Sequence, residues 1–399
     1  GEAIAWHVKE YLNEKKLIKD KNVERVVFNE ITKKAVTHGI KNPRQIEPLL
    51  VDAYMARRAL DYLVGFNISP ILWTKLPGSK SAGRVQSVAL KLITEREHEI
   101  ELFNPEEFWT LSIQFNDDDK NSLLASITQL NDKKIDKFSF TNKTEINKAM
   151  DEIKSKRFQI NDISSKIVNR NPSGPFTTST LQQVSSGRLG YGASRTMQIA
   201  QKLYQGIEID GETIGLITYM RTDGTNLSTD AIDTFRKYIK TKFGEEYVPS
   251  SPENYSGKKA KNAQEAHEAI RPTDIMRAPD TVKKYLSLDQ HKLYNLIWSR
   301  ALSSQMKPAQ FDRNTITVTS DDNGTICKAS GSIIKFDGFL KVMKDNKKDD
   351  DENILPEMKK GPIDIEALLD EQHFTQPPPR YTEASLVKKL EELGIGRPS

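Results

Sequence analysis

The chain has 399 residues, with 37% hydrophobic and 29% charged side chains, a formal net charge of +4 and one cysteine, Cys327. This composition is ordinary for a folded protein of two to four domains and argues against wholesale disorder. The sequence has no apolar run near the roughly 20 residues that span a bilayer, and a single cysteine excludes an intrachain disulfide and a cysteine-rich zinc site. We therefore expect an intracellular protein without a membrane partner, and the basic balance by itself favours polyanionic partners only weakly.

Both ends of the sequence look cut. The first residues, GEAIAWHVKEYLNEKK, begin without Met and already show Ile4, Val8 and Leu12 at helical spacing. The last residues, LGIGRPS, end in the middle of a motif. We expect a fragment of a longer protein.

Helical and β patterns alternate along the chain. Residues 1–102 read mainly as helix, and residues 173–305 return to helix after a β segment. Period-two alternation and β-branched residues predict strands within 103–172 and again within 306–376. Two β segments around a helical block indicate that the block is inserted into a β domain, which is itself inserted into a helical one. The predicted fold class is α+β, in several domains.

Four local patterns make specific predictions. Ser228 is a good N-cap for a helix, and a second helix is expected to start near Thr382. The run TIGLITY (213–219) predicts a short buried strand, and DGFLKVM (337–343) predicts a strand of the second β segment.

Tyr219 stands at the end of the predicted strand TIGLITY, where side chains commonly emerge into a cleft. A strand-end tyrosine more often has a structural role, with its hydroxyl hydrogen-bonded at the edge of the core. Arg221 lies two residues further on, so on an extended segment it points to the same side. A neighbouring cation favours phenolate and stabilises charge on an attacked phosphate, whereas an ion pair with Asp223 is the alternative role for Arg221. These residues alone leave both interpretations open.

A second cluster lies in AHEAIRPTD (266–274). His267 and Arg271 share one face if this segment is helical. A lone His is more often structural than catalytic, and His267 has no second His or Cys at the spacing of metal ligands.

Two further segments place small and hydroxyl residues before a helix. In SKSAGRVQS (79–87), backbone N–H groups with Arg84 and Gln86 form a suitable phosphate cradle, whereas helix capping by Ser81 is the simpler interpretation. PFTTSTLQQ (175–183) offers a similar hydroxyl-rich helix start.

Taken together and in order, the motifs resemble the type IA DNA topoisomerases, in the group of bacterial topoisomerase I. The matching stretches span nearly the whole chain: GEAIAWH, RVVFNEIT, ARRALDYLVGF, SAGRVQS, PFTTSTLQQ, GLITYMRTDGTNLS, AHEAIRPTD and PPPRYTEASLVKKLEELGIGRPS. Met220 in TYMRTD favours topoisomerase I over topoisomerase III, which typically has Pro there.

The resemblance implies a toroid in which a tyrosine-bearing domain lifts away on β arms and admits DNA. It divides this chain into a remnant of the Toprim domain (1–36), the first part of a helical DNA-groove domain (37–102), the first part of the β arm domain (103–172), the tyrosine-bearing helical domain (173–305), the second part of the arm (306–376) and the second part of the groove domain (377–399).

The resemblance also implies a chemistry. Tyr219 would attack single-stranded DNA to give a 5′-phosphotyrosine, and after strand passage the free 3′-hydroxyl would reseal the strand. Supercoils would relax without ATP, because the phosphotyrosine conserves the energy of the phosphodiester. Arg221 would stabilise the scissile phosphate and the phenolate, His267 would hydrogen-bond near the site, and Arg271 would help to position that segment.

Other matched residues would contact DNA. The single-strand groove would be lined by the loop residues Ser81, Ala82, Gly83, Arg84, Val85 and Gln86 and by the helix residues Arg57, Arg58 and Asp61, while Arg25 would meet the phosphate backbone. Many relatives carry a second Arg at the position of Tyr62, where a Tyr could instead stack on a base.

The main departure from the family concerns metal. Relatives bind Mg²⁺ through an acidic Toprim cluster just before GEAIAWH, so we expect the full-length enzyme to use Mg²⁺ although its ligands are absent from this chain, in which Glu2 is a remnant and not a ligand. The fragment itself would then be inactive or impaired. We expect a monomer in the cytoplasm, at the nucleoid. The alternative function is a single-strand-binding clamp in which Tyr219 stacks on a base without cleaving DNA.

Overall fold

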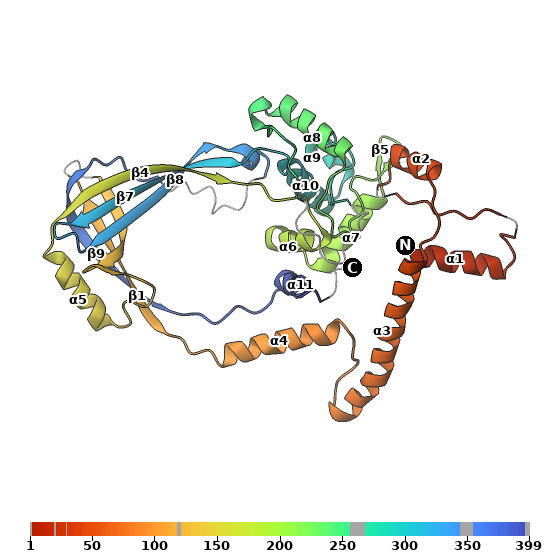
Figure 1. Ribbon diagram of the computed structural model, residues 1–399, viewed down its shortest axis with the longest axis horizontal. Helices are drawn as coiled ribbons and strands as arrows, with labels where there is room; N and C mark the ends of the chain where they lie inside the picture. The colour runs from red at the N-terminus through yellow and green to blue at the C-terminus, as the bar shows by residue number, and fades with distance from the viewer. Residues whose placement is uncertain are drawn as a thin grey trace.

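The structure is a computed structural model that describes residues 2–19, 21–28, 30–117, 121–255, 268–343 and 354–395. Figure 1 shows a ring-like arrangement, in which the chain leaves the helices near the N-terminus, runs out along a β arm and returns to a second helical domain. The ring closes where α11 (Glu383–Glu392) lies beside α6 (Thr178–Leu189). None of the helices in these ranges is long and apolar enough to cross a membrane.

The N-terminal quarter is helical and loosely packed. It comprises α1 (Glu2–Glu14), α2 (Lys33–Lys41), α3 (Pro48–Lys75) and α4 (Gln86–Glu101). In α3, which is 28 residues long, only Val51 and Ser69 are buried. Most of the apolar side chains of this long helix are therefore exposed.

The arm is a closed antiparallel barrel. Its strands are β1 (Glu107–Asn116), β2 (Ser122–Leu130), β3 (Lys133–Lys134), β4 (Phe158–Arg170), β7 (Ala309–Ser320), β8 (Ile326–Phe336) and β9 (Gly361–Phe374). The order is β1-β9-β4-β7-β8-β2-β3, and an additional β1–β2 pairing closes the barrel. Helix α5 (Lys143–Lys154) packs three buried residues, Ile146, Ala149 and Ile153, against the arm's core.

Three strands continue beyond the barrel. Strand β9 pairs with β4 only at residues 158–160, whereas β7 follows β4 along its whole length to Arg170. Residues 161–169 of β4 are exposed, because this ribbon is not covered by the core of the barrel. In Figure 1 the ribbon of β4, β7 and β8 leads from the barrel to the second helical domain.

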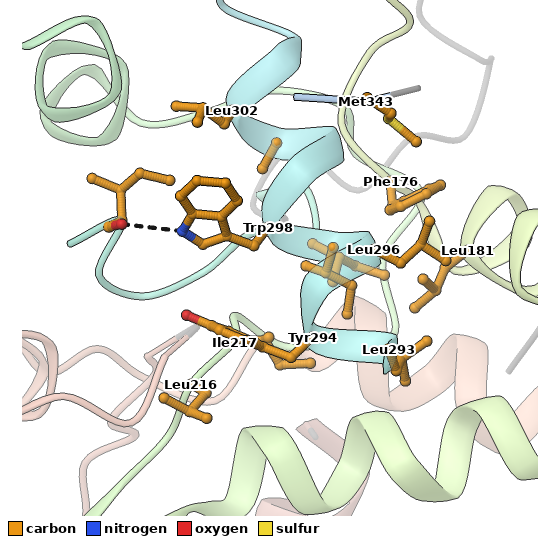
Figure 2. Packing of buried hydrophobic residues seen from close by; sticks show 14 of the residues in the cluster. Phe176, Leu181, Leu216, Ile217, Leu293, Tyr294, Leu296, Trp298, Leu302 and Met343 are labelled. Carbon is orange, nitrogen blue, oxygen red and sulfur yellow. Dashed lines mark hydrogen bonds between the residues drawn. The ribbon is translucent and has the colours of Figure 1, made fainter. Parts of the chain in front are cut away.

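The second helical domain has its own core. Its elements are α6, α7 (Ala193–Gln205), β5 (Ile207–Ile209), β6 (Glu212–Ile214), α8 (Thr229–Lys242), η1 (Glu245–Tyr247), α9 (Pro279–Val282), η2 (Lys283–Tyr285) and α10 (Leu288–Ser303). Figure 2 shows α10 at the centre, with Tyr294 and Trp298 among aliphatic side chains. The indole Nε1 of Trp298 donates to the Ile275 carbonyl at 3.0 Å, so the buried N–H is satisfied.

The strand predicted for DGFLKVM is wrong. Residues Gly338–Lys341 form a short 3₁₀ helix, η3, and Phe339, Leu340 and Met343 join the core of the second helical domain. The reason is that Gly338 has a φ of +51°, which interrupts an extended strand, and that both Phe339 and Leu340 pack into a helical core. This segment therefore fastens the end of the arm onto the helical domain.

Two predicted helix starts are confirmed, and one strand is shorter than predicted. Ser228 caps α8 by accepting the Ala231 N–H at 3.4 Å, and Thr382 caps α11 by accepting the Ser385 N–H at 3.1 Å. In TIGLITY, the regular strand ends at Ile214.

A substitution at Gly338 tests whether the packing of η3 into the second helical domain contributes to stability. Its φ is +51°, and an added Cβ would lie 2.5 Å from the Pro308 carbonyl oxygen. We expect Gly338→Ala to destabilise the protein by at least about 2 kcal/mol, because the left-handed conformation and the backbone clash both oppose a side chain. Gly78 also has a positive φ, +90°, but has open space around it, so Gly78→Ala is the matched control and should cost only about 1 kcal/mol. Denaturant unfolding checks both, and equal losses would contradict this account of Gly338.

Candidate active site

The segment that carries Tyr219 runs extended between two other segments of the chain. Its Thr218 N–H donates to the Arg271 carbonyl at 2.9 Å, and the Thr178 N–H donates to the Thr222 carbonyl at 2.9 Å. Bridges also join Ile217 to Pro272 and Phe176 to Ile270. The three motifs around residues 176, 219 and 271, which are separate in sequence, thus form one small irregular sheet.

Buried threonine hydroxyls complete the hydrogen bonding of this sheet. The Thr178 hydroxyl donates to the Met220 carbonyl at 2.8 Å and accepts the Thr222 N–H at 2.8 Å. The Thr218 hydroxyl donates to the Ala269 carbonyl at 2.7 Å. Sequence reasoning missed this role of Thr178 and Thr218, although the run of hydroxyl residues in PFTTSTLQQ pointed to the segment.

Tyr219 and Arg221 flank a buried residue at the edge of the domain. Met220 is 1% exposed, Tyr219 is half-buried and Arg221 is exposed. The Tyr219 ring makes an edge contact with Tyr204, with ring centroids 5.3 Å apart. Within the described part of the chain, the Tyr219 hydroxyl and the Arg221 guanidinium have no hydrogen bond or ion pair. Among the residues that the structure describes, the Tyr219 hydroxyl makes no hydrogen bond at the core edge, and Arg221 makes no ion pair with Asp223, the two alternatives considered above.

Arg271 is a buried structural cation. Its Nε and Nη2 donate to the two carboxylate oxygens of Glu268 at 2.7 and 2.9 Å, and Nη2 also donates to Glu30 at 3.1 Å. The side chain is only 8% exposed. Arg271 thus links Glu268 to Glu30 of the N-terminal segment, and both its expected positioning role and its predicted DNA contact stay predictions.

The prediction for His267 cannot be followed further, because His267 lies outside the described residues. The residues after it, Glu268–Thr273, are extended, so the helical face shared by His267 and Arg271 does not form in this part of the segment. Backbone bonds to Phe176 and Thr218 hold it in that conformation.

The N-terminal segment adjoins the site. An added Cβ at Gly215 would lie 3.2 Å from the Ile31 side chain, which shows how closely the two segments approach. Beside it, Lys34 donates to Asp230 at 2.5 Å. Arg25 is farther along this segment, where its backbone pairs with Arg44 and its Nε lies 3.5 Å from the Glu2 carboxylate.

A second group of predicted residues lies between α3 and the loop before α4. Arg84 makes a two-bonded ion pair with Asp61, with distances of 2.6 and 3.1 Å. The hydrogen bond from Arg84 holds the pKa of the Asp61 carboxyl below its usual value, and the charge of Arg57 contributes. Arg57 and Arg58 are both exposed on α3.

The loop itself is held by side-chain contacts. The Ala82 N–H donates to the Ser69 hydroxyl at 3.0 Å, and Gln86 Nε2 donates to the Ser81 carbonyl and hydroxyl at 3.2 and 3.1 Å. Helix α4 begins at Gln86, after Gly83 and Val85, without a side-chain cap. The interpretation of Ser81 as a helix cap is therefore wrong. Alongside lies a pocket of about 280 Å³, whose lining residues are Gly65, Phe66, Ser69, Pro70, Trp73, Ser81 and Ala82.

The two groups remain separate. No hydrogen bond or ion pair joins the Arg84 loop to Tyr219 within the described residues. Those residues also contain no group of three or more His, Cys, Asp or Glu side chains that could hold a metal ion. Glu2 makes an ion pair with Arg44 at 2.5 Å.

The similarity to known proteins covers both the Tyr219 segment and the Arg84–Asp61 region. A family model described as DNA topoisomerase matches residues 45–399. The chain belongs to this family. It is 52% identical to DNA topoisomerase 1 of Rickettsia felis over 404 residues, covering 100% of this chain and 52% of that protein. With DNA topoisomerase 1 of Xylella fastidiosa the identity is 48% over 410 residues, covering 100% of this chain and 50% of that protein.

The fold is similar to that of a solved topoisomerase. Full-length topoisomerase I from Thermotoga maritima matches with a TM-score of 0.81 and 38% identity, covering 100% of this chain and 62% of that chain. The α+β fold predicted from the motifs, that of a type IA topoisomerase, is thereby confirmed. The chain spans about half the length of the curated relatives it matches.

The buried Arg271 makes a stability prediction. Arg271→Ala should destabilise the second helical domain by about 2 kcal/mol, because it leaves the partly buried carboxylates of Glu268 and Glu30 without their cation. Lys34→Ala breaks an ion pair in which both side chains are more than three-quarters exposed, and it should leave the stability almost unchanged. Thermal unfolding of the two variants compares them, and similar losses would show that Arg271 does not hold this segment.

Proposed function

We propose that the protein is an ATP-independent DNA topoisomerase that relaxes negatively supercoiled DNA through transient cleavage of one strand. Tyr219 is the nucleophile. Its hydroxyl oxygen attacks a phosphodiester, a phosphotyrosine forms to the 5′ phosphate, and the 3′-hydroxyl of the other fragment leaves. Attack of that hydroxyl on the phosphotyrosine reverses the step, so that no bond energy is lost and no ATP is needed.

This proposal rests on the Tyr219 hydroxyl and the Arg221 guanidinium, two groups at the edge of the second helical domain that have no hydrogen bond or ion pair within the described residues. The Tyr219 hydroxyl has no hydrogen bond within the described residues, so its oxygen is not occupied by another group of the protein and can approach a phosphate. The exposed guanidinium of Arg221 carries a permanent charge and can hydrogen-bond two phosphate oxygens. It would stabilise the negative charge that develops on the attacked phosphate.

The substrate we propose is a single-stranded region of DNA. It would lie along the groove of Arg57, Arg58, Asp61 and the Arg84 loop, while Tyr219 acts on its backbone. The exposed cations on α3 would bind phosphates, and the apolar pocket beside Ala82 would accept part of a base. We propose that the enzyme works as a monomer on DNA of the nucleoid and that the full-length protein uses Mg²⁺, which no group of the described residues is built to hold.

Tyr219→Phe tests the nucleophile. It removes one oxygen atom and should abolish the covalent complex between full-length protein and a radiolabelled single-stranded oligonucleotide, while binding stays within about twofold. Tyr285→Phe, which removes a hydroxyl bonded to Asp210 elsewhere in the domain, is the matched control and should keep the complex. A covalent complex formed by Tyr219→Phe would refute the assignment. Binding without any covalent complex in the unmodified protein would favour the clamp function.

Arg84 tests the groove. If it contacts a phosphate, Arg84→Ala should reduce the slope of log K against log salt for single-stranded DNA by about 0.7. Lys237, exposed on α8, is a control with the same charge, and Lys237→Ala should leave the slope unchanged. An unchanged slope for Arg84→Ala would leave Arg84 with only its role in holding Asp61.

A further inference from the structure

Tyr255 lies where the arm joins the second helical domain. The chain enters this domain after β4, at Pro172–Gly174, and leaves it after α10, at Ser304–Lys307. We call these two segments the crossings. The Tyr255 hydroxyl contacts both, because it lies within hydrogen-bonding distance of the Pro172 carbonyl at 3.3 Å and of the Ser304 carbonyl at 3.0 Å. One hydroxyl proton is thus shared between two acceptors, one on each crossing.

The ring of Tyr255 is fitted closely to the first crossing. A Cβ added to Gly174 would lie 2.9 Å from ring atom Cδ1 and 3.0 Å from Cγ, so only glycine leaves room for the ring. Burial, followed by the negative charge of Glu253, raises the pKa of the Tyr255 phenol to about 12. The hydroxyl therefore keeps its proton at neutral pH and remains a donor.

A neighbouring residue strengthens the contact with the second crossing. The Glu253 N–H donates to Gln305 Oε1 at 3.2 Å, and Gln305 Nε2 donates back to the Glu253 carbonyl at 2.9 Å. Gln305 is only 1% exposed. The side chain of Gln305 thus pairs with the backbone just before Tyr255 as a second strand would.

The main chain of Tyr255 faces the loop that follows the proposed nucleophile. The Thr225 hydroxyl donates to the Tyr255 carbonyl at 2.9 Å. Thr225 lies between Arg221 and the helix cap Ser228. Tyr255 therefore contacts both crossings with its side chain and the Tyr219–Ser228 loop with its backbone.

Other bonds hold this loop from within the helical domain. Thr222 is bound by Thr178, and the Asn226 carbonyl accepts the Ala269 N–H at 2.9 Å. The bond from Thr225 differs because it leads to Tyr255 and through it to the crossings, where bending between arm and domain would change the positions of the Pro172 and Ser304 carbonyls.

We propose that Tyr255 is a positioning residue that couples the arm to the loop carrying Tyr219 and Arg221. When the crossings keep their native separation, Tyr255 holds Thr225 and orients the loop for attack. When the crossings move apart, the shared hydroxyl bond breaks and the loop loses this restraint. The coupling rests on the proposed function of Tyr219, but it also predicts a property of the loop that can be measured without DNA.

Two substitutions test this coupling, because each removes a different hydrogen bond between the crossings and the loop. Tyr255→Phe removes the bonds to Pro172 and Ser304, and Thr225→Val removes the bond to the Tyr255 carbonyl with little change in shape. Tyr285→Phe and Thr234→Val are matched controls, since their hydroxyls bind Asp210 and the Asp230 carbonyl, away from the crossings. Each variant is made in the full-length protein, and the double variant Tyr255→Phe, Thr225→Val is added.

The first measurement is amide hydrogen exchange of residues 222–228 without DNA, by mass spectrometry. We expect exchange to accelerate about tenfold in Tyr255→Phe and in Thr225→Val, and by no more in the double variant, because both break one path. The controls should exchange at the unmodified rate. Unchanged exchange in both single variants, or independent effects that multiply in the double variant, would overturn the proposal.

The second measurement separates binding from the chemical step. With a single-stranded oligonucleotide, both single variants should bind within about twofold of the unmodified protein but form the covalent complex about tenfold more slowly. If Tyr255 had a purely structural role, the rate of covalent-complex formation by the bound protein would not change. That result would overturn the positioning role. If the unmodified protein forms no covalent complex, the proposed function fails while hydrogen exchange still decides the coupling. If Tyr255→Phe does not fold, Thr225→Val decides it.

Discussion

The arrangement of the site depends on one constraint: the buried backbone around Tyr219 has no regular strand to pair with. Every buried N–H and carbonyl must nevertheless find a partner, because an unpaired one costs as much as a lost hydrogen bond. The hydroxyls of Thr178 and Thr218 supply part of those partners, and the segment around Arg271 supplies the rest. The phenol of Tyr219 is left half-buried at the edge, because the hydrogen bonds that fix this segment are made by the backbone on either side of it.

Local signals in the sequence were sufficient where neighbouring residues decide the structure. The helix starts at Ser228 and Thr382 were predicted correctly, since a capping hydroxyl acts within three residues of its own position. The spacing of the apolar residues likewise indicated which segments are helical and which are β, because it shows which face of each segment is buried. The family and its fold followed from the combination of the motifs and from no single one of them.

The errors arose where distant contacts override local preference. DGFLKVM alternates poorly and is buried by a different domain from the one that its position in the chain suggests. The segment after His267 has the composition of a helix but is held extended by two other segments. The pairing of Asp61 with Arg84 was not predicted either, because Arg84 comes from a separate loop, where its guanidinium forms two bonds to the carboxylate. No pattern in the sequence specifies these pairings.

The joints around the second helical domain differ in character. Phe339 and Leu340 of η3 and the following Met343 lie in the core cluster of this domain, so this segment joins the arm to it by apolar burial. Across the ring, several contacts are polar and exposed: Lys34 binds Asp230, and the Glu383 carboxylate accepts the Ala193 N–H. Water can solvate such groups as they separate, whereas parting an apolar joint would create sticky surface. At these exposed polar contacts, separation would uncover groups that water can solvate, whereas separation at η3 would uncover apolar side chains.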